Sequence, residues 1–131
     1  METSLPLFIM LMSNEHEKVQ MAAMTASVAA VSERPVAMFI SMNAVSIFRR
    51  DAGSDALRGE EFSTLMHQKG VPSPVTLLEQ GKLLGELKVY ACSMALDVSG
   101  TALDELADVF DDTVGLTKFL SDAEHGQIVT F

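Results

Sequence analysis

A single cysteine, Cys92, is the residue of this sequence best suited to nucleophilic chemistry. The stretch from Leu87 to Ala91 predicts a short buried strand, and a helical pattern begins at Ser93 and Met94. A thiol at a strand-to-helix junction is close to outward-pointing backbone N–H groups and to the positive end of a helix dipole. Such surroundings favour the thiolate, which is the nucleophilic form. Cys92 is therefore the predicted catalytic residue.

Cys92 also has a second interpretation, as a small apolar residue packed in the core, because unpaired cysteines are among the most buried residue types. The sequence leaves both interpretations open. One cysteine excludes an internal disulfide, and it excludes a dithiol redox cycle or a peroxidase with its own resolving cysteine. A single cysteine is consistent with a reducing compartment, so we expect the protein in the cytoplasm.

The remaining side chains give little support for metal or cofactor chemistry. His16, His67 and His125 are too far apart in the sequence for a recognisable metal-ligand spacing, and no Cys-x-x-Cys pair is present. His16 could approach Cys92 from the end of the first strand, although a solvated position on a helix is the favoured interpretation. There is no glycine-rich phosphate loop. We expect neither a metal nor a cofactor.

The composition is that of a folded globular chain. Hydrophobic residues make up 48% of the 131 residues, charged residues 21%, and the net charge is −9. This acidic balance argues against nucleic acid and against anionic membrane surfaces as partners, since both require Lys and Arg. The longest apolar run, from Leu5 to Met12, is too short to span a bilayer.

Strands and helices alternate along the chain. Continuous apolar runs predict strands, and apolar residues at helical spacing predict helices between them. The predicted strands are 5–12, 36–40, 87–91, 108–110 and 127–131; the predicted helices are 14–31, 44–50, 61–67, 75–84, a segment from 93, and 114–124. Residues 51–60 are a predicted surface loop. The pattern indicates one α/β domain over residues 1–131, a three-layer sandwich around a mostly parallel sheet of about five strands.

In such a sheet the functional site lies outside the carboxyl ends of the strands. Polar residues follow three of the predicted strands, and we expect their side chains to meet there. The predicted substrate-binding residues are Ser13, Asn14, Ser41, Asn43 and Ser93.

The segment from Ala91 to Gly100, ACSMALDVSG, is similar to the A-C-x-M-x-x-D-x-x-G segment of the DsrE/DsrF-like superfamily, in its DsrE2-like (peroxiredoxin-like) branch. The stretch from Val114 to Leu120, VGLTKFL, is similar to the closing G-[VL]-x-x-F-L helix of the same family. The chain therefore resembles this family over nearly its whole length, with the specific motifs from Ala91 onward.

This resemblance implies a flavodoxin-like fold, a cytoplasmic location and assembly into homo-oligomers, as trimers or hexamers. It implies that Cys92 carries sulfane sulfur as a persulfide, with a small sulfur-carrier protein as a possible partner. A sulfurtransferase-like carrier is thus one hypothesis. The alternative is a non-catalytic oligomeric binding or scaffold protein of the same fold, in which Cys92 is only packed.

Overall fold

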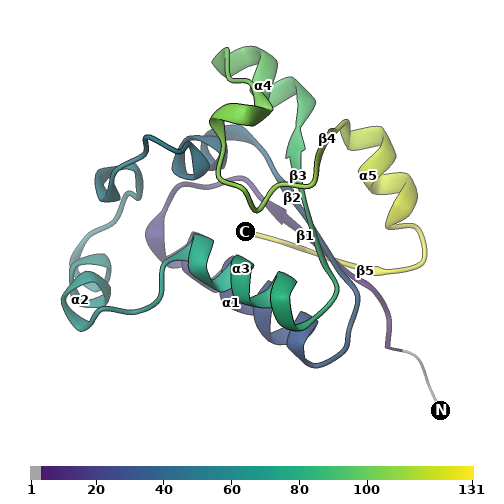
Figure 1. Ribbon diagram of the computed structural model, residues 1–131, viewed down its shortest axis with the longest axis horizontal. Helices are drawn as coiled ribbons and strands as arrows, with labels where there is room; N and C mark the ends of the chain where they lie inside the picture. Colours follow the sequence, from purple (N-terminus) through teal and green to yellow (C-terminus); the bar gives the residue numbers. More distant parts are fainter. Residues whose placement is uncertain (1–3) are drawn as a thin grey trace.

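A computed structural model describes residues 4–131, so the first three residues of the predicted domain lie outside the described part. Figure 1 shows the arrangement of the elements. In chain order they are β1 (Leu7–Leu11), α1 (His16–Val31), β2 (Val36–Ile40), η1 (Met42–Phe48), η2 (Ser54–Ala56), α2 (Glu61–Lys69), α3 (Pro74–Leu84), β3 (Leu87–Cys92), α4 (Ser93–Ser99), η3 (Leu103–Glu105), β4 (Asp112–Val114), α5 (Leu116–Asp122) and β5 (Gln127–Thr130). Within the described residues, no helix combines the length and the hydropathy that crossing a bilayer requires.

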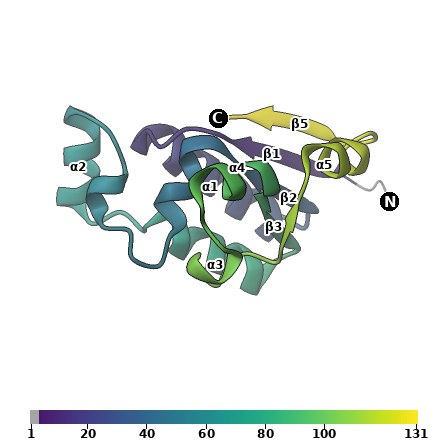
Figure 2. The same ribbon diagram turned by 90° about the horizontal axis from the view of Figure 1, so that it is seen from above.

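The five strands form one sheet in the order β4-β3-β2-β1-β5, and every neighbouring pair is parallel. The predicted α/β fold with a parallel sheet of about five strands is therefore confirmed. Figure 2 shows β5 beside β1, so the last strand of the chain pairs with the first. Strands β2 and β3 lie inside the sheet, with neighbours on both sides. The predicted site residues Ser41 and Cys92 lie at the carboxyl ends of these two strands.

The apolar run of β1 is explained by burial on both faces. Four of its five residues are buried and Met10 is partly buried. Leu7, Ile9 and Leu11 alternate with Phe8 and Met10, so each set faces a different side of the sheet. Both sides are covered by helices, as is usual for parallel sheets.

Helices α1 and α3 lie side by side along one face of the sheet (Figure 1). The small residues Ala22, Ala23 and Ala26 of α1 are almost fully buried. Gly81 sits inside α3, where a Cβ atom would lie 2.9 Å from Leu87 Cδ2 and 3.2 Å from the α carbon of Ser27. Glycine is a poor helix former, but here the absence of a side chain allows α1 and α3 to approach each other.

Helix α5 packs against the other face through Phe119, on the opposite side of the strands from α1 and α3 in Figure 1. The Phe119 ring stacks on Phe39 with centroids 4.9 Å apart and meets Phe8 edge-on at 5.5 Å. These three rings hold α5 to β1 and β2.

The predicted strand at 108–110 is wrong, and so is the start of the last helix at Val114. Residues 108–110 form a turn that buries Val109, and the strand is Asp112–Val114. Asp111 starts the pairing, because its N–H donates to the Val89 carbonyl at 2.8 Å and its carboxylate accepts from the Val89 N–H at 2.8 Å. The Asp111 carboxylate thus accepts a hydrogen bond that a backbone carbonyl of the neighbouring strand usually accepts. Hydrophobic patterning does not predict such a bond.

Candidate functional site

All five strands point the same way, so their carboxyl ends lie at one edge of the sheet. The register pairs Ile40 with Ala91 and Cys92 with Val114. Continuing that register by one residue places Ser41 beside Cys92. In open α/β sheets this edge is where ligands bind, so it is the first place to examine for a site.

Cys92 lies at the predicted junction: it is the last residue of β3 and the N-cap residue of α4. Its backbone is extended, with φ −69° and ψ 121°, and its side chain caps no helical N–H. Helix α4 ends at Gly100, which takes the left-handed conformation (φ 65°) typical of a helix stop. Cys92 is 3% exposed and belongs to the hydrophobic core.

Two of the predicted binding residues lie close to Cys92. Ser41 is buried, and its N–H donates to the Leu11 carbonyl at 2.9 Å. Ser93 opens α4 and is partly exposed; its Oγ would lie 3.7 Å from a Cβ placed on Gly115. Asn43 lies further out in η1, exposed, with its carbonyl accepting from Ser46 Oγ at 2.7 Å.

Ser13 and Asn14 belong to a different part of the same edge. They line a cavity of about 530 Å³ with Arg58 and Glu60, which Cys92 does not line. Ser13 Oγ accepts from the Glu15 N–H at 3.0 Å, and the Asn14 carbonyl accepts from the Arg58 N–H at 2.8 Å. The Asn14 carbonyl therefore holds the 51–60 loop against the start of α1, whereas the Ser13 hydroxyl bonds within its own segment.

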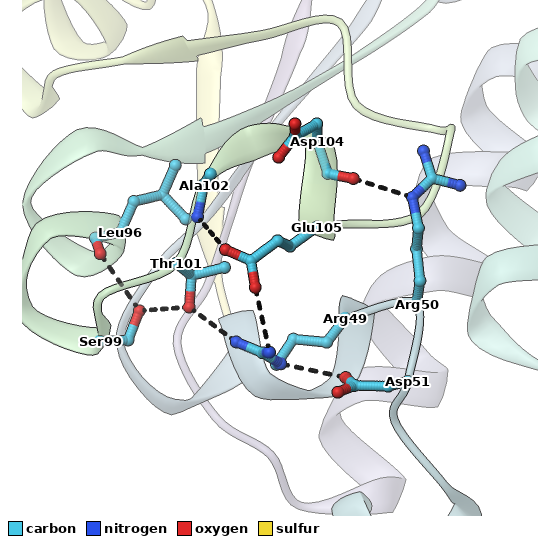
Figure 3. A network of polar contacts seen from close by, with 9 residues as sticks. All are labelled: Arg49, Arg50, Asp51, Leu96, Ser99, Thr101, Ala102, Asp104 and Glu105. Carbon is cyan, nitrogen blue, oxygen red and sulfur yellow. Dashed lines mark hydrogen bonds and ion pairs between the residues drawn. The ribbon is translucent and has the colours of Figure 1, made fainter.

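A network of charged and hydroxyl groups fixes the loop that follows α4 (Figure 3). The Arg49 guanidinium donates to Thr101 Oγ1 at 3.0 Å, to Asp51 Oδ1 at 3.1 Å and to Glu105 Oε2 at 3.3 Å. The hydrogen bond and charge of Asp51 raise the pKa of Arg49, and the same contact lowers the pKa of Asp51. Ser99 Oγ donates to Thr101 Oγ1 at 2.9 Å, which joins the network to the end of α4. The end of η1 is thereby tied to the helix that begins at Cys92.

A second polar cluster surrounds His16. The prediction that His16 is a solvated helix residue is wrong, because it is 2% exposed. Its Nδ1 and Ser63 Oγ form a hydrogen bond of 2.7 Å, and its ring lies 4.7 Å from the His67 ring, centroid to centroid. Burial lowers the pKa of His16 below its ordinary value of 6.5, the charge of His67 lowers it further, and Gln20 and Glu17 oppose the shift.

The sequence carries one signal for this cluster. His16 comes three residues before the buried Val19, and Gln20 comes one residue after it. At this helical spacing both residues lie on the buried face of α1. Both side chains therefore point inward, where a polar group needs a partner. The partners come from α2 and from the segment before α3, and the sequence does not predict that contact.

Among residues 4–131, no group of three or more His, Cys, Asp and Glu side chains is arranged to hold a metal ion. The polar groups beside the two rings are the Ser63 hydroxyl, which bonds to His16 Nδ1, and the Gln20 amide, which lines the same cavity.

Comparisons with known proteins identify relatives of the fold. The sequence profile described as the DsrE/DsrF/DrsH-like family matches residues 54–131, a segment that contains Cys92. No curated protein sequence matches the chain. The structure is similar to MTH1491, a protein of unknown function from Methanobacterium thermoautotrophicum, with TM-score 0.64 and 16% identity over 98% of this chain and 100% of that chain. It is also similar to the YchN protein from E. coli, with TM-score 0.65 and 15% identity over 97% and 99% of the two chains.

Proposed function

The chain belongs to the DsrE/DsrF/DrsH-like family, and from this premise we propose that it carries sulfane sulfur as a persulfide on Cys92. The observation that carries the proposal is the position of Cys92, at the carboxyl end of an inner strand and at the first turn of α4, inside the family-matched segment. Ser41 and Ser93 are the nearest predicted binding residues. In this proposal Ser13, Asn14 and Asn43 extend the same binding edge.

The proposed reaction needs one thiolate and no outside oxidant. The Cys92 thiolate attacks the outer sulfur of a polysulfide or the sulfane sulfur of thiosulfate, and the S–S bond of the donor breaks. The leaving group, a shorter polysulfide or sulfite, takes the electron pair, and Cys92 becomes a persulfide. A thiolate of an acceptor protein then attacks the outer sulfur and releases Cys92 as a thiolate.

The burial of Cys92 sets a condition on this function. Because Cys92 is only 3% exposed, its sulfur must become accessible through a local opening of the short helix α4. The same burial favours a second candidate function, a non-catalytic binding or scaffold protein in which Cys92 is only packed. The two candidates therefore differ in one measurable property, the reactivity of this thiol in the folded chain.

The proposal includes assembly into a homo-oligomer, a trimer or a hexamer, and transfer of sulfur to a small carrier protein. Exposed apolar side chains support assembly: Met94 and Val98 on α4, and Leu116 and Leu120 on α5. Sedimentation that shows only a monomer across concentrations would contradict it. The assignment to the DsrE2-like (peroxiredoxin-like) branch, the single domain over residues 1–131 and the cytoplasmic location are further parts of the proposal.

The test is the intact mass of the folded protein after incubation with polysulfide or thiosulfate. We expect the wild type to gain one or more sulfur masses that a reductant removes, and Cys92→Ser to gain none. Ser99→Ala, at the other end of α4, is the matched control and should gain sulfur as the wild type does. No gain in the wild type, together with resistance of Cys92 to alkylation, would exclude the carrier and support the scaffold.

A further inference from the structure

The Gln20 side chain is the polar group of the core whose bonding is incomplete. It is 6% exposed, and its Nε2 donates to the Pro72 carbonyl at 3.0 Å. Its Oε1 accepts no hydrogen bond, since the His16 ring nearby bonds to Ser63 instead, and it is the one buried side-chain nitrogen or oxygen in this condition among the described residues. Buried acceptors in folded proteins are nearly always paired, so a donor from outside the chain is expected here.

Gln20 lines a cavity of about 310 Å³, close to the lower end of the usual range for small-molecule sites. This space is equivalent to about ten water molecules. It lies between α1, the 51–60 loop and the segment that leads into α3. Apolar side chains form most of the wall, including Ile47, Leu57, Val71 and Val75.

The charge of the cavity restricts what it can hold. Its lining contains no Asp, Glu, Lys or Arg. His16, on the inner wall, has a lowered pKa and is therefore uncharged at neutral pH. A charged ligand would lose its hydration without gaining a partner of opposite charge, whereas an uncharged one would not.

One side chain that lines the cavity, His67, is exposed, and its ring lies 4.7 Å from the His16 ring, centroid to centroid. Because Gln20 Oε1 is fully buried, a ligand in the cavity reaches it only after a lining side chain moves, and the exposed His67 is the candidate for that movement. His16 itself stays fixed by its 2.7 Å hydrogen bond to Ser63.

We propose that this cavity binds a small uncharged organic molecule, of about ten non-hydrogen atoms, with a flat apolar body and an amide N–H or a hydroxyl that donates to Gln20 Oε1. The cavity wall supplies the apolar contacts, and Gln20 selects for the donor. This site is separate from the proposed persulfide function, since Cys92 does not line the cavity. Failure of either proposal leaves the other standing.

The test uses benzamide as the probe, titrated into the full chain and followed by the backbone amide signals in NMR. Methyl benzoate, which lacks a donor, and benzoate, which is charged, are the matched probes. We expect benzamide to shift signals of the cavity residues in a saturable way, and both matched probes to bind at least about tenfold more weakly. Gln20→Met should weaken benzamide binding by a similar factor, and Gln68→Met, which changes an exposed amide on α2, should not.

A variant that blocks the cavity keeps the test usable if Gln20→Met does not fold. Val71→Trp, at an exposed residue of the cavity lining, should abolish benzamide binding without changing Gln20. The proposal is overturned if benzamide shifts no cavity signals, if methyl benzoate binds equally well, or if a crystal soaked in benzamide shows only water at Gln20. Sulfur loading of Cys92 should be the same in Val71→Trp and the wild type.

Discussion

The segment after β3 and the segment after β1 leave the same edge of the sheet, and the chain builds them in different ways. After β3, the thiol of Cys92 enters the hydrophobic core, and the helix it begins is anchored by apolar residues such as Leu96. After β1, His16 and Gln20 enter the interior with polar groups, and their partners come from Ser63 and Pro72, far along the sequence. The first region has a buried thiol among apolar side chains, and the second has buried polar groups, one of which, Gln20 Oε1, lacks a partner. The proposed sulfur chemistry therefore depends on access to the thiol, and the proposed ligand binding depends on the unpaired acceptor of Gln20.

The largest effect is expected for Leu96→Ala, which tests whether α4 is held by the core. Leu96 is 6% exposed, so its truncation should lower the free energy of unfolding by about 2–4 kcal/mol, measured by urea denaturation. Alkylation of Cys92 in the folded chain should become faster, because α4 then opens more often. Leu83→Ala, at a position 82% exposed on α3, is the matched control and should cost much less. Equal losses would contradict the anchoring of α4 through the core.

A smaller effect is expected for Ser63→Ala in the His16 cluster. This change leaves the buried Nδ1 of His16 without its partner at 2.7 Å, and the free energy of unfolding should fall by about 1–2 kcal/mol. Thr64→Ala alters the next residue, whose hydroxyl is exposed and bonds within its own helix, and it should change stability less. If the two variants were equally stable, the hydrogen bond to His16 would not stabilise the fold.

The pH dependence of stability should separate His16 from the other histidines. Since burial lowers the pKa of His16 below 6.5, the folded chain binds fewer protons than the unfolded chain as pH falls through that value. The free energy of unfolding should therefore decrease on acidification through 6.5, and this contribution should stop changing below the folded-state pKa. The drop in thermal midpoint between about pH 7.5 and about pH 5.5 should be smaller in His16→Gln than in the wild type. A drop of the same size in His16→Gln and in the control His125→Gln would refute the assignment.

The smallest effect is expected for Arg49→Gln, because the network in Figure 3 is largely solvent-exposed. Its loss should lower the thermal midpoint slightly, and added salt should shrink the difference from the wild type, since salt screens exposed ion pairs. Lys18→Gln removes an exposed pair with Glu15 that ties no distant segments together, and it should change the midpoint even less. A difference that salt does not alter would mean that Arg49 acts through packing.

The sequence predicts the parts of this molecule that depend on local pattern. The junction at Cys92 follows from one apolar strand running into one helical segment, and the sheet edge follows from the alternation of strands and helices. The strand β4 was not predictable in this way, because only Val114 of its three residues is apolar, and because the Asp111 side chain starts its pairing. The apolar residue Val109 lies two residues before Asp111 and is buried in a turn. It led instead to the wrong prediction of a strand at residues 108–110.

The His16 cluster shows a second limit of pattern-based prediction. Its residues belong to α1, α2 and the segment before α3, and their contacts bridge 47 and 52 positions of the sequence. Local periodicity places His16 and Gln20 on the inner face of α1, but it contains no information on which distant residues meet them. Leu116 and Leu120 are a similar case: helical spacing puts them on the same face of α5 as the buried Phe119 and Ala123, yet both are exposed.

The pairing of β1 with β5 has a consequence for how the chain reaches its folded state. Leu7 is paired with Gln127, so about 120 residues must be synthesised after β1 before its outer edge has a partner. At ordinary translation rates this interval lasts about 6 to 24 s. During it, an apolar strand offers unpaired N–H and C=O groups to any other nascent chain. Closing so long a loop is also slow, and a delay in docking β5 would favour aggregation of the newly made protein over its release in the folded state.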